Sequence, residues 1–383
     1  MAEGPTPEKT VIRGLEGVVA AETSISYVDG THGRLYYQGY DIHDIAEDIS
    51  FAECVFLLWN GRLPTRDELN HIRTDIVKEM RLTDGIITVL KNIPKETHPM
   101  AALRMGVDAL AVFDPDADDI SLEANKRKAK RLIGQIPAII AALQRLRAGK
   151  EVIQPDPDLS VSANQIYMMR GDKPDKLEQE AMDCLMVLHA DHGLNASTFT
   201  ARVITATLSD IHSALSGAIG ALKGPLHGGA NQKVMEMILE IDHVDMVQDY
   251  IEGMLNNKKR IMGFGHRVYQ VEDPRAKHLR CYSELLCEKT DQQHLYEISH
   301  RIEMIVREAK GIYPNVDFYS ATVQHALGIA PEYFTTLFAA SRTSGWIAHI
   351  FEQYADNRLI RPTSKYTGEL GLPFIPLDQR KAV

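Results

Sequence analysis

The chain has 383 residues, of which 44% are hydrophobic and 25% charged, and its formal net charge is −10. This is the composition of an ordinary globular protein of roughly two or three domains. The acidic balance excludes a general nucleic-acid binder, which needs a basic surface to neutralise phosphates. It leaves room for a local basic site that binds one small anion. The longest apolar runs, such as 138–143, are far too short to span a membrane.

The N-terminus and the cysteines favour a cytoplasmic protein. The first ten residues are polar, contain two prolines and lack the apolar run of a signal peptide. The four cysteines, Cys54, Cys184, Cys281 and Cys287, form no Cys-x-x-Cys pair and are too few for a disulfide framework. We therefore expect reduced thiols that lie in the core.

A single β-hairpin is predicted near the start of the chain. Residues 1–13 are expected to be loosely attached. Two short strands, 24–28 and 34–37, flank the sequence Asp-Gly-Thr-His-Gly at 29–33, which is typical of a hairpin turn. From residue 41 onward, apolar residues recur at helical spacing.

The rest of the chain is predicted to be helical. Ser50 is expected to cap one helix, and Pro137 is expected to kink or end a long helix over 124–146. Other predicted helices cover 176–188, 196–208, 213–222, 274–289, 294–309 and 331–357. One hairpin and many helical segments predict a mainly α, multi-helical fold.

Two histidines lie among glycines in the stretch 222–275. His227 is followed by two glycines and then by a helical pattern, and His266 follows Gly-Phe-Gly. At a helix N-terminus the macrodipole disfavours a charged imidazole, so a neutral His227 could donate a hydrogen bond to a carbonyl oxygen. His227 could equally be a simple helix cap, and the turn alone does not decide between the two.

Three known motifs of nucleotide-binding proteins and hydrolases are absent or incomplete in this sequence. The sequence Gly263-Phe-Gly265 begins like a dinucleotide loop, but the third glycine would fall at Val268 and no strand precedes it. The phosphate-loop pattern is absent, and no Gly-x-Ser-x-Gly elbow accompanies the His-Gly-Gly sequence. What remains is a glycine turn behind three basic residues, 258–260, which is either a site for an anionic, nucleotide-bearing ligand or a solvated helix end.

The remaining titratable residues favour acid–base chemistry without a metal. His189 and His192 are three residues apart, but no third ligand follows at a recognisable spacing, so we predict no metal site. Asp317 is either a helix N-cap, the reading that the sequence favours, or a buried base with a raised pKa. Arg342 lies in an apolar helical segment, where an arginine usually has an anionic partner.

Six segments, in this order, resemble citrate synthase along nearly the whole chain. They are Leu188-His-Ala-Asp-His-Gly-Leu-Asn-Ala-Ser-Thr198, Gly224-Pro-Leu-His-Gly-Gly-Ala-Asn231, Ile261-Met-Gly-Phe-Gly-His-Arg-Val-Tyr269, Asp273-Pro-Arg-Ala276, Tyr313-Pro-Asn-Val-Asp-Phe-Tyr319 and Arg361-Pro362. The length resembles that of the short bacterial, cyanobacterial and archaeal enzymes. The resemblance implies a two-domain helical fold, with a large domain over 1–228 and 331–383 and a small domain over 229–330 that closes over the substrates.

The resemblance also implies a role for each matching residue. Asp317 would remove a proton from the acetyl-CoA methyl group, His227 would stabilise the enol, and His266 would protonate the alkoxide formed on oxaloacetate. The residues that would bind oxaloacetate are His192, Arg275, Arg342 and, from the neighbouring subunit, Arg361. The residues that would line the CoA site are Arg260, Ile261, Met262, Gly263 and Phe264.

The partners implied are two small molecules, oxaloacetate and the cosubstrate acetyl-CoA, with no permanently bound cofactor and no metal. A homodimer is expected, and assembly to a hexamer is a further hypothesis. Two alternatives stay open: a 2-methylcitrate synthase, which would use propionyl-CoA with the same residues, and a non-catalytic scaffold relative. One methylene is worth only about 1–3 kcal/mol of discrimination in an apolar pocket, so the motifs do not separate the two acyl-CoA substrates.

Overall fold

A computed structural model describes residues 11–380 of the chain. The chain divides into two compact units, one made of its two ends, 1–22 and 359–383, and one made of Thr23–Arg358. The first unit contains two short 3-10 helices, η1 (Arg13–Leu15) and η4 (Leu377–Gln379). Of the segment expected to be loosely attached, residues 1–10 lie outside the described part, and η1 begins at its end.

The second unit begins with a small antiparallel sheet of three strands, β1 (Ser26–Asp29), β2 (Arg34–Tyr37) and β3 (Tyr40–Asp41). The predicted hairpin is confirmed, with Ser26 opposite Tyr37, whereas the two-residue strand β3 was not predicted. The hydroxyl of the buried Tyr37 donates to the carbonyl of Asp191 at 2.9 Å and accepts from the Asp191 backbone N–H at 3.1 Å. The sheet is thereby fixed to the segment that carries His192.

Helices make up most of the first half of the chain. They are α1 (Ile42–Ile45), α2 (Phe51–Asn60), α3 (Arg66–Glu79), α4 (Asp84–Lys91), α5 (Pro99–Phe113), α6 (Leu122–Arg147), α7 (Val161–Arg170) and α8 (Lys176–His189). Ser50 caps α2 as predicted, in a reciprocal capping box with Glu53. Of the two outcomes predicted for Pro137, a kink or an end of the helix, the end is wrong, because α6 continues through it.

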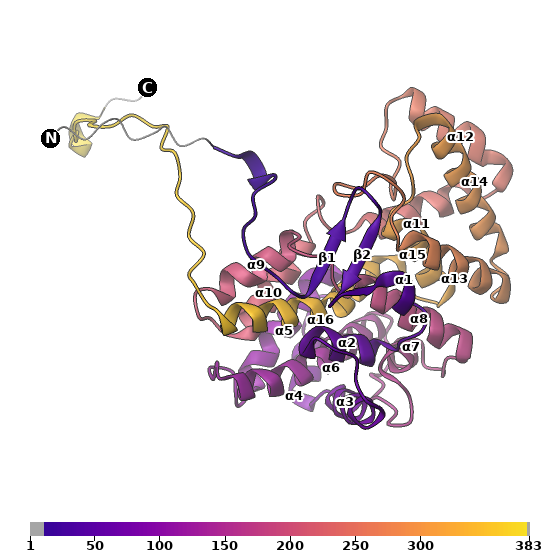
Figure 1. Ribbon diagram of the computed structural model, residues 1–383, viewed down its shortest axis with the longest axis horizontal. Coiled ribbons are helices and arrows are strands. Elements are labelled where there is room, and N and C mark those ends of the chain that lie inside the picture. The colour runs from indigo at the N-terminus through magenta and orange to yellow at the C-terminus, as the bar shows by residue number, and fades with distance from the viewer. Residues whose placement is uncertain (1–10, 381–383) are drawn as a thin grey trace. The chain divides into compact units, whose positions relative to one another are not determined.

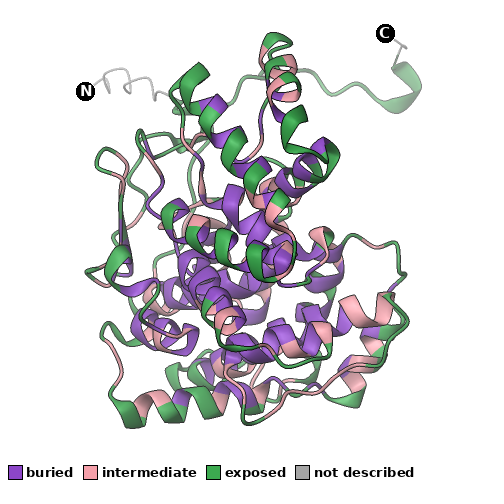
Figure 2. Ribbon diagram, turned by 90° about the vertical axis from the view of Figure 1, so that its right-hand side faces the viewer, coloured by how far each residue is buried: buried purple, intermediate pink, exposed green. Residues whose placement is uncertain are grey.

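The second half contains α9 (Ala196–Thr205), α10 (Ile211–Leu222), α11 (Ala230–Ile241), η2 (Val244–Met246), α12 (Val247–Asn256), α13 (Ala276–Lys289), α14 (Gln293–Lys310), α15 (Val316–Ala326), η3 (Pro331–Tyr333) and α16 (Phe334–Ala355). Figure 1 shows α11 to α15 grouped on one side of this unit, with α16 running through its middle. Helix α16 packs against α2, α6, α8, α9 and α10. It is buried on nearly all sides, as the purple centre of Figure 2 shows, and its buried residues include polar ones such as Arg342 and His349.

The mainly α fold predicted from the sequence is confirmed. The expectation that every cysteine lies in the core is wrong for one of the four, because Cys281 is exposed on α13 while the other three are buried. Over residues 11–380, no helix is long and apolar enough to cross a membrane.

Candidate active site

Arg342 is held inside the protein with its terminal nitrogens unpaired. It lies on the buried helix α16, its Nε donates to the carbonyl of His189 at 2.7 Å, and its guanidinium lies 4.7 Å from the centre of the Phe338 ring. Burial lowers the pKa of Arg342 to about 10, which still leaves it charged at neutral pH. Neither terminal nitrogen has a hydrogen-bond partner among the described residues. A buried, charged fork of this kind is suited to a carboxylate.

Arg275 immediately precedes α13 and is neutralised by a buried partner. Its Nε and one terminal nitrogen donate to the two carboxylate oxygens of Asp273 at 2.9 and 2.8 Å. Burial opposes the charge of Arg275, but the Asp273 carboxylate outweighs it and raises the pKa of Arg275. Asp273 also accepts the backbone N–H of Val316 at 3.2 Å. The pair therefore ties Arg275 to the start of the helix that carries Asp317.

Asp317 is a carboxylate without a partner. The sequence favoured Asp317 as the N-cap of α15, and this is wrong, because the cap is Asn315, whose side chain accepts the backbone N–H of Asp317 at 3.0 Å. No hydrogen bond to the Asp317 carboxylate is found within residues 11–380. Burial raises the pKa of Asp317 to about 6, although the charges of Arg275 and Arg342 oppose the shift. A carboxylate with such a pKa is suited to act as a base near neutral pH.

His227 is neutral and its orientation is fixed by one serine. It lies in the turn before α11, whose N-cap is Gly229, so the simple capping role is excluded. Its Nε2 accepts the backbone N–H of Ser197 at 3.3 Å, and lies 2.8 Å from the Ser197 hydroxyl oxygen. Nδ1 therefore carries the ring proton. Burial, helped by the charge of Arg342, lowers the pKa of His227 to about 4.

The turn that carries His227 requires a glycine. A Cβ atom on Gly228 would lie 2.2 Å from the carbonyl oxygen of Leu222 and 3.1 Å from the Thr335 side chain. Only glycine permits this close approach of backbone to backbone. The glycine next to His227 thus brings the end of α10, the turn and the start of α16 together.

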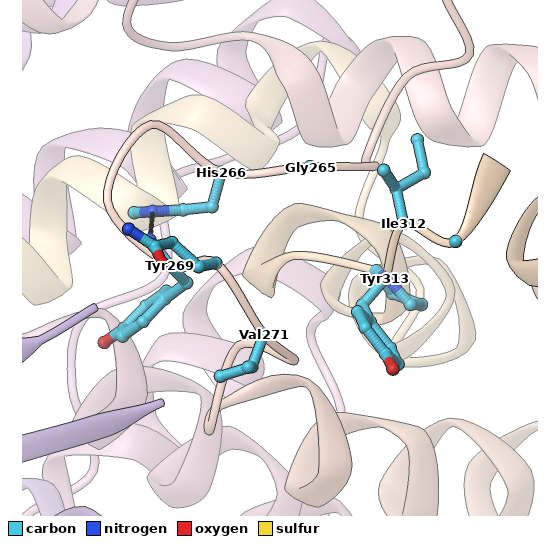
Figure 3. A pocket seen from close by; sticks show the side chains of 9 residues that line it. Gly265, His266, Tyr269, Val271, Ile312 and Tyr313 are labelled. Carbon is cyan, nitrogen blue, oxygen red and sulfur yellow. Dashed lines mark hydrogen bonds between the residues drawn. The ribbon is translucent and has the colours of Figure 1, made fainter. Parts of the chain in front are cut away.

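His266 forms a cluster with Tyr269 and His192. Its Nδ1 accepts the backbone N–H of Tyr269 at 3.1 Å (Figure 3) and that of Val268 at 3.0 Å, so its Nε2 carries the proton. The His266 ring centre is 4.7 Å from that of Tyr269 and 5.2 Å from that of His192. Burial and the charge of Arg275 lower the pKa of His266 to about 4. The ring is thus a neutral imidazole that can donate through Nε2.

His192 is also neutral, since burial and then Arg275 lower its pKa well below the ordinary value. Its Nε2 lies 3.0 Å from the Tyr269 hydroxyl. The nearby His189 packs against Phe338, with the two ring centres 4.5 Å apart. His189 and His192 thus contact different aromatic rings, Phe338 and Tyr269, while the charges of Arg275 and Arg342 act on both.

The segment 260–264 leads directly to His266. Arg260 is exposed, Met262 is partly exposed, and Ile261 and Phe264 are buried. A Cβ atom on Gly263 would lie 2.7 Å from the Val234 side chain and 2.8 Å from the Phe318 ring, and its φ is +80°, so this position also requires glycine.

Two backbone hydrogen bonds join this segment to the one before α15. The N–H of Asn315 donates to the carbonyl of Gly263 at 2.9 Å, and the N–H of Gly265 donates to that of Tyr313 at 3.0 Å. A small cavity of about 60 Å³ lies beside this junction, lined by His266, Tyr269 and Tyr313 among others (Figure 3). The positions of His266 and Asp317 are therefore fixed relative to each other by neighbouring backbone.

Six of the predicted residues are electrostatically coupled in one site. The charge of Arg275 acts on His192, His266 and Asp317, and that of Arg342 acts on His192, His227 and Asp317. Arg361 lies outside this group, exposed in the unit formed by the chain ends. Its predicted contribution to a neighbouring subunit remains a prediction.

Three residues for which the sequence predicted no role hold the side chains of the site in position. Ser197 orients His227, Asp273 neutralises Arg275, and Tyr269 contacts His192. All three fall inside segments that carried the resemblance. Each of the three contacts a residue that lies between 2 and 77 positions away in the sequence. Only the Asp273–Arg275 pair is close enough in the sequence to indicate an ion pair.

The fold and the site together define a class of enzyme. An unpaired carboxylate with a raised pKa can remove a proton, two neutral imidazoles can donate to oxygen atoms that gain charge, and two buried arginines can bind carboxylates. These are the requirements of acid–base catalysis that activates a carbon acid next to a carbonyl and adds it to an anionic substrate.

Comparisons with known proteins identify the family. The family "Citrate synthase, C-terminal domain" matches residues 14–363. The chain is 50% identical to citrate synthase 2 of Bacillus subtilis, over 97% of this chain and 100% of that protein. It is 43% identical to the citrate/2-methylcitrate synthase of the same organism, over 93% and 96% of the two chains.

A solved structure agrees with these sequences. The chain superimposes on the citrate synthase of the archaeon Thermoplasma acidophilum with a TM-score of 0.91 at 34% identity, over 97% of this chain and 100% of that one. That structure is a ternary complex with carboxymethyl coenzyme A and oxaloacetate. The chain belongs to the citrate synthase family.

Proposed function

We propose that this chain condenses acetyl-CoA with oxaloacetate and hydrolyses the resulting citryl-CoA to citrate and CoA. The observation that carries the proposal is the unpaired Asp317 carboxylate, whose pKa is raised to about 6 beside two neutral histidines and two buried arginines. The methyl protons of a thioester are very weakly acidic, so a base alone is not sufficient. The carbonyl oxygen must be stabilised as the proton leaves.

The tautomers of His227 and His266 support one assignment of the ring nitrogen that donates in each step. Asp317 takes a proton from the acetyl methyl group while Nδ1–H of His227 donates to the thioester oxygen, giving the enol. The enol carbon attacks the ketone of oxaloacetate and forms the new carbon–carbon bond. Nε2–H of His266 then protonates the alkoxide. Water cleaves the thioester and releases the CoA thiol. In both histidines the other nitrogen already accepts a hydrogen bond, so the donating nitrogen is fixed in advance.

Oxaloacetate is proposed to bind through its carboxylates. The two free nitrogens of Arg342 and the remaining terminal nitrogen of Arg275 are the cations available to it. His192 would donate to or accept from the substrate beside Tyr269. We propose that Arg361 of a second copy completes the site, which makes the active form a homodimer. Large exposed apolar residues on α5, Met105, Val112 and Phe113, support self-association; a hexamer remains a hypothesis.

Acetyl-CoA is proposed to lie along residues 260–264, where the glycine turn lets backbone approach the ligand and Arg260 is free for its phosphates. No permanently bound cofactor or metal has a role in this proposal. The grouping of α11 to α15 in Figure 1 supports a small domain over 229–330. From the resemblance we propose that it closes on a large domain formed by 1–228 and 331–383. Closure would exclude water during the carbon–carbon bond formation. A cytoplasmic location remains a prediction from the sequence.

The test is CoA thiol release with oxaloacetate, comparing acetyl-CoA with propionyl-CoA and the wild type with Asp317→Asn. We expect release with acetyl-CoA and a loss of at least roughly a hundredfold in the variant, as for removal of a catalytic base. A thermal melt of the variant checks that it is folded. No release with either substrate from a folded wild-type protein would contradict the enzymatic proposal and favour a non-catalytic scaffold.

A second substrate has a specific observation in its favour. One relative carries the double name citrate/2-methylcitrate synthase, and another, from Corynebacterium glutamicum, is named 2-methylcitrate synthase 1 at 38% identity. A preference for propionyl-CoA in the same assay would change the assigned substrate and leave the roles of Asp317, His227 and His266 unchanged.

A further inference from the structure

A second cavity, of about 160 Å³, lies between the end of α4, the loop that follows it and the end of α6. Its apolar wall consists of Leu90, Ile93, Leu143 and Leu146. The rest of its lining is Lys91, Lys95 and Arg147. The cavity shares no lining residue with the catalytic group described above.

The three cations of this cavity have no anionic partner. Among the ion pairs of residues 11–380, none involves Lys91, Lys95 or Arg147. Glu96 directly follows Lys95 and does not line the cavity. Cations in the last turn of a helix are stabilised by its macrodipole, which accounts for Lys91 and Arg147. The macrodipole does not account for Lys95, which follows the helix, or for the fact that all three cations line the same cavity.

Buried polar atoms at the end of α6 are also unsatisfied. Nη2 of Arg147 and Oε1 of Gln144 are buried and have no hydrogen-bond partner. Leaving a buried charged donor unpaired is costly, typically more than about 1–3 kcal/mol. The guanidinium of Arg147 also lies against Tyr333, whose ring centre is 5.6 Å from its guanidinium carbon. An anion in the cavity would supply what this arginine lacks.

We propose that this cavity binds a small organic anion, with a carboxylate or phosphate head between Lys91, Lys95 and Arg147 and a short apolar body against the leucines and Ile93. The three unpaired cations select a negatively charged head group, and the four apolar side chains select an apolar body. The volume admits a molecule of several heavy atoms but not a nucleotide.

The location connects this cavity to the catalytic residues. Tyr333, on which Arg147 packs, ends η3, the short segment between α15, which carries Asp317, and α16, which carries Arg342. Two residues further along, the Thr335 side chain closely approaches the backbone of Gly228 beside His227. An anion that repositions Arg147 would therefore act on the segment that joins the two halves of the catalytic site.

The test is isothermal titration of the full-length protein with butyl phosphate, pentanoate and inorganic phosphate, each in the presence of saturating CoA and oxaloacetate. The altered protein is Lys91→Ala/Lys95→Ala, in which both exposed lysines are removed without touching the core. The control is Lys150→Ala, an exposed lysine that follows the same helix α6 and does not line the cavity.

We expect one of the two organic anions to bind once per chain, roughly tenfold more weakly in the double variant and equally in the control. The tighter of butyl phosphate and pentanoate identifies the head group. Inorganic phosphate should bind at least roughly tenfold more weakly than butyl phosphate, because it leaves the apolar wall uncovered. The proposal is overturned by the absence of saturable binding, by equal binding to the double variant, or by inorganic phosphate binding as tightly as the organic anions. Because binding is measured without turnover, a failure here is separate from a failure of the proposed reaction.

Discussion

Asp273 and Asp317 lie on neighbouring segments of the site and have opposite electrostatic environments. Burial disfavours the charge of Asp273, but Arg275 outweighs burial and lowers its pKa. Burial of Asp317 is not compensated, so its pKa rises to about 6. The Asp273 charge also contributes to raising the pKa of Asp317. The paired carboxylate is structural, while the unpaired one is kept ready to accept a proton at a cost in stability.

This difference predicts opposite effects of two matching substitutions on the free energy of unfolding. The folded pKa of Asp317 is above its unfolded value, so its cost is absent below about pH 4 and fully present above about pH 6. Asp317→Asn should therefore be more stable than the wild type by up to about 3 kcal/mol at pH 8, with the gain disappearing on acidification. Asp273→Asn should be destabilised by about 3–5 kcal/mol, since it leaves Arg275 buried without a partner.

Urea denaturation of both variants and the wild type at pH 4.5 and pH 8 measures these differences. A destabilised Asp317→Asn protein at pH 8 would show that the carboxylate has a favourable partner in the folded state, contrary to the environment described for it.

A second prediction at the scale of one residue concerns the effect of Ser197 on kcat. Ser197→Ala removes the hydroxyl that lies 2.8 Å from Nε2 of His227 and that also bonds to Asn195 Oδ1 and the Trp346 indole. Only the backbone N–H of residue 197 then holds the His227 ring, which weakens the preference for the proton on Nδ1. We expect kcat to fall by roughly ten- to a hundredfold, because the donor to the thioester oxygen is then only part of the time in the required tautomer. The KM for oxaloacetate should change little, since Ser197 is not among the proposed oxaloacetate ligands.

The control is Thr200→Ala on the same helix, α9, whose hydroxyl donates only to the Ala196 carbonyl. Equal kcat values for Ser197→Ala and the wild type would exclude the orienting role of Ser197.

At the scale of elements, Asn315 connects two parts of the catalytic machinery. Its side chain caps α15 by accepting the Asp317 N–H, and its amide nitrogen donates to the Gly265 carbonyl at 2.9 Å. One side chain therefore sets both the start of the helix that carries Asp317 and the position of the turn that carries His266.

Asn315→Ala should cost about 1 kcal/mol of stability, the usual value for a lost cap, and in addition lower kcat at least roughly tenfold, because misplaced catalytic groups are costly. Ser160→Ala is the matched control, since Ser160 caps α7, which carries none of the site residues. It should lose similar stability and keep its kcat. If both variants lose only stability, measured by thermal unfolding and steady-state kinetics, the connecting role of Asn315 is excluded.

The sequence predicted helices better than it predicted the environments of the site residues. Helical periodicity and the Ser50 cap depend on residues a few positions apart, so they could be recognised directly. Pro137 misled because α6 is held by packing on several sides, which outweighs one lost backbone hydrogen bond. The prediction that Asp317 is a helix cap was wrong, because Asn315, two residues before it, occupies that role. The motifs identified the six clustered site residues; the contacts that set their protonation states join distant segments.

At the scale of the whole molecule, the proposed contribution of Arg361 to a neighbouring site can be tested by mixing two inactive proteins. In Asp317→Asn the proposed base is missing, and in Arg361→Ala the arginine proposed to come from the second subunit is missing. If Arg361 acts across the dimer, a mixed dimer has one site with both defects and one intact site. Exchange of subunits should therefore restore roughly a quarter of the wild-type activity.

The measurement is thiol release before and after subunit exchange at equal concentrations of the two variants. The control mixes Asp317→Asn with Arg342→Ala, whose defects both lie within the unit Thr23–Arg358. In this mixture each chain carries a defect in its own site, so no activity should return. No recovery in the first mixture, with mixed dimers shown by mass spectrometry, would place the action of Arg361 within its own chain.

The backbone junction between residues 263–265 and 313–315 has a consequence for how this sequence can change in evolution. The separation of His266 from Asp317 is set by two hydrogen bonds between short segments, and not by the length of the chain that connects them. The exposed faces of α13 and α14 and the turn between them can therefore accept substitutions and insertions while the catalytic pair stays in place. Within either short segment, one inserted residue would shift the backbone by about 3.3 Å and change the pairing. We expect length variation among descendants of this chain to accumulate between the two segments and to be absent inside them.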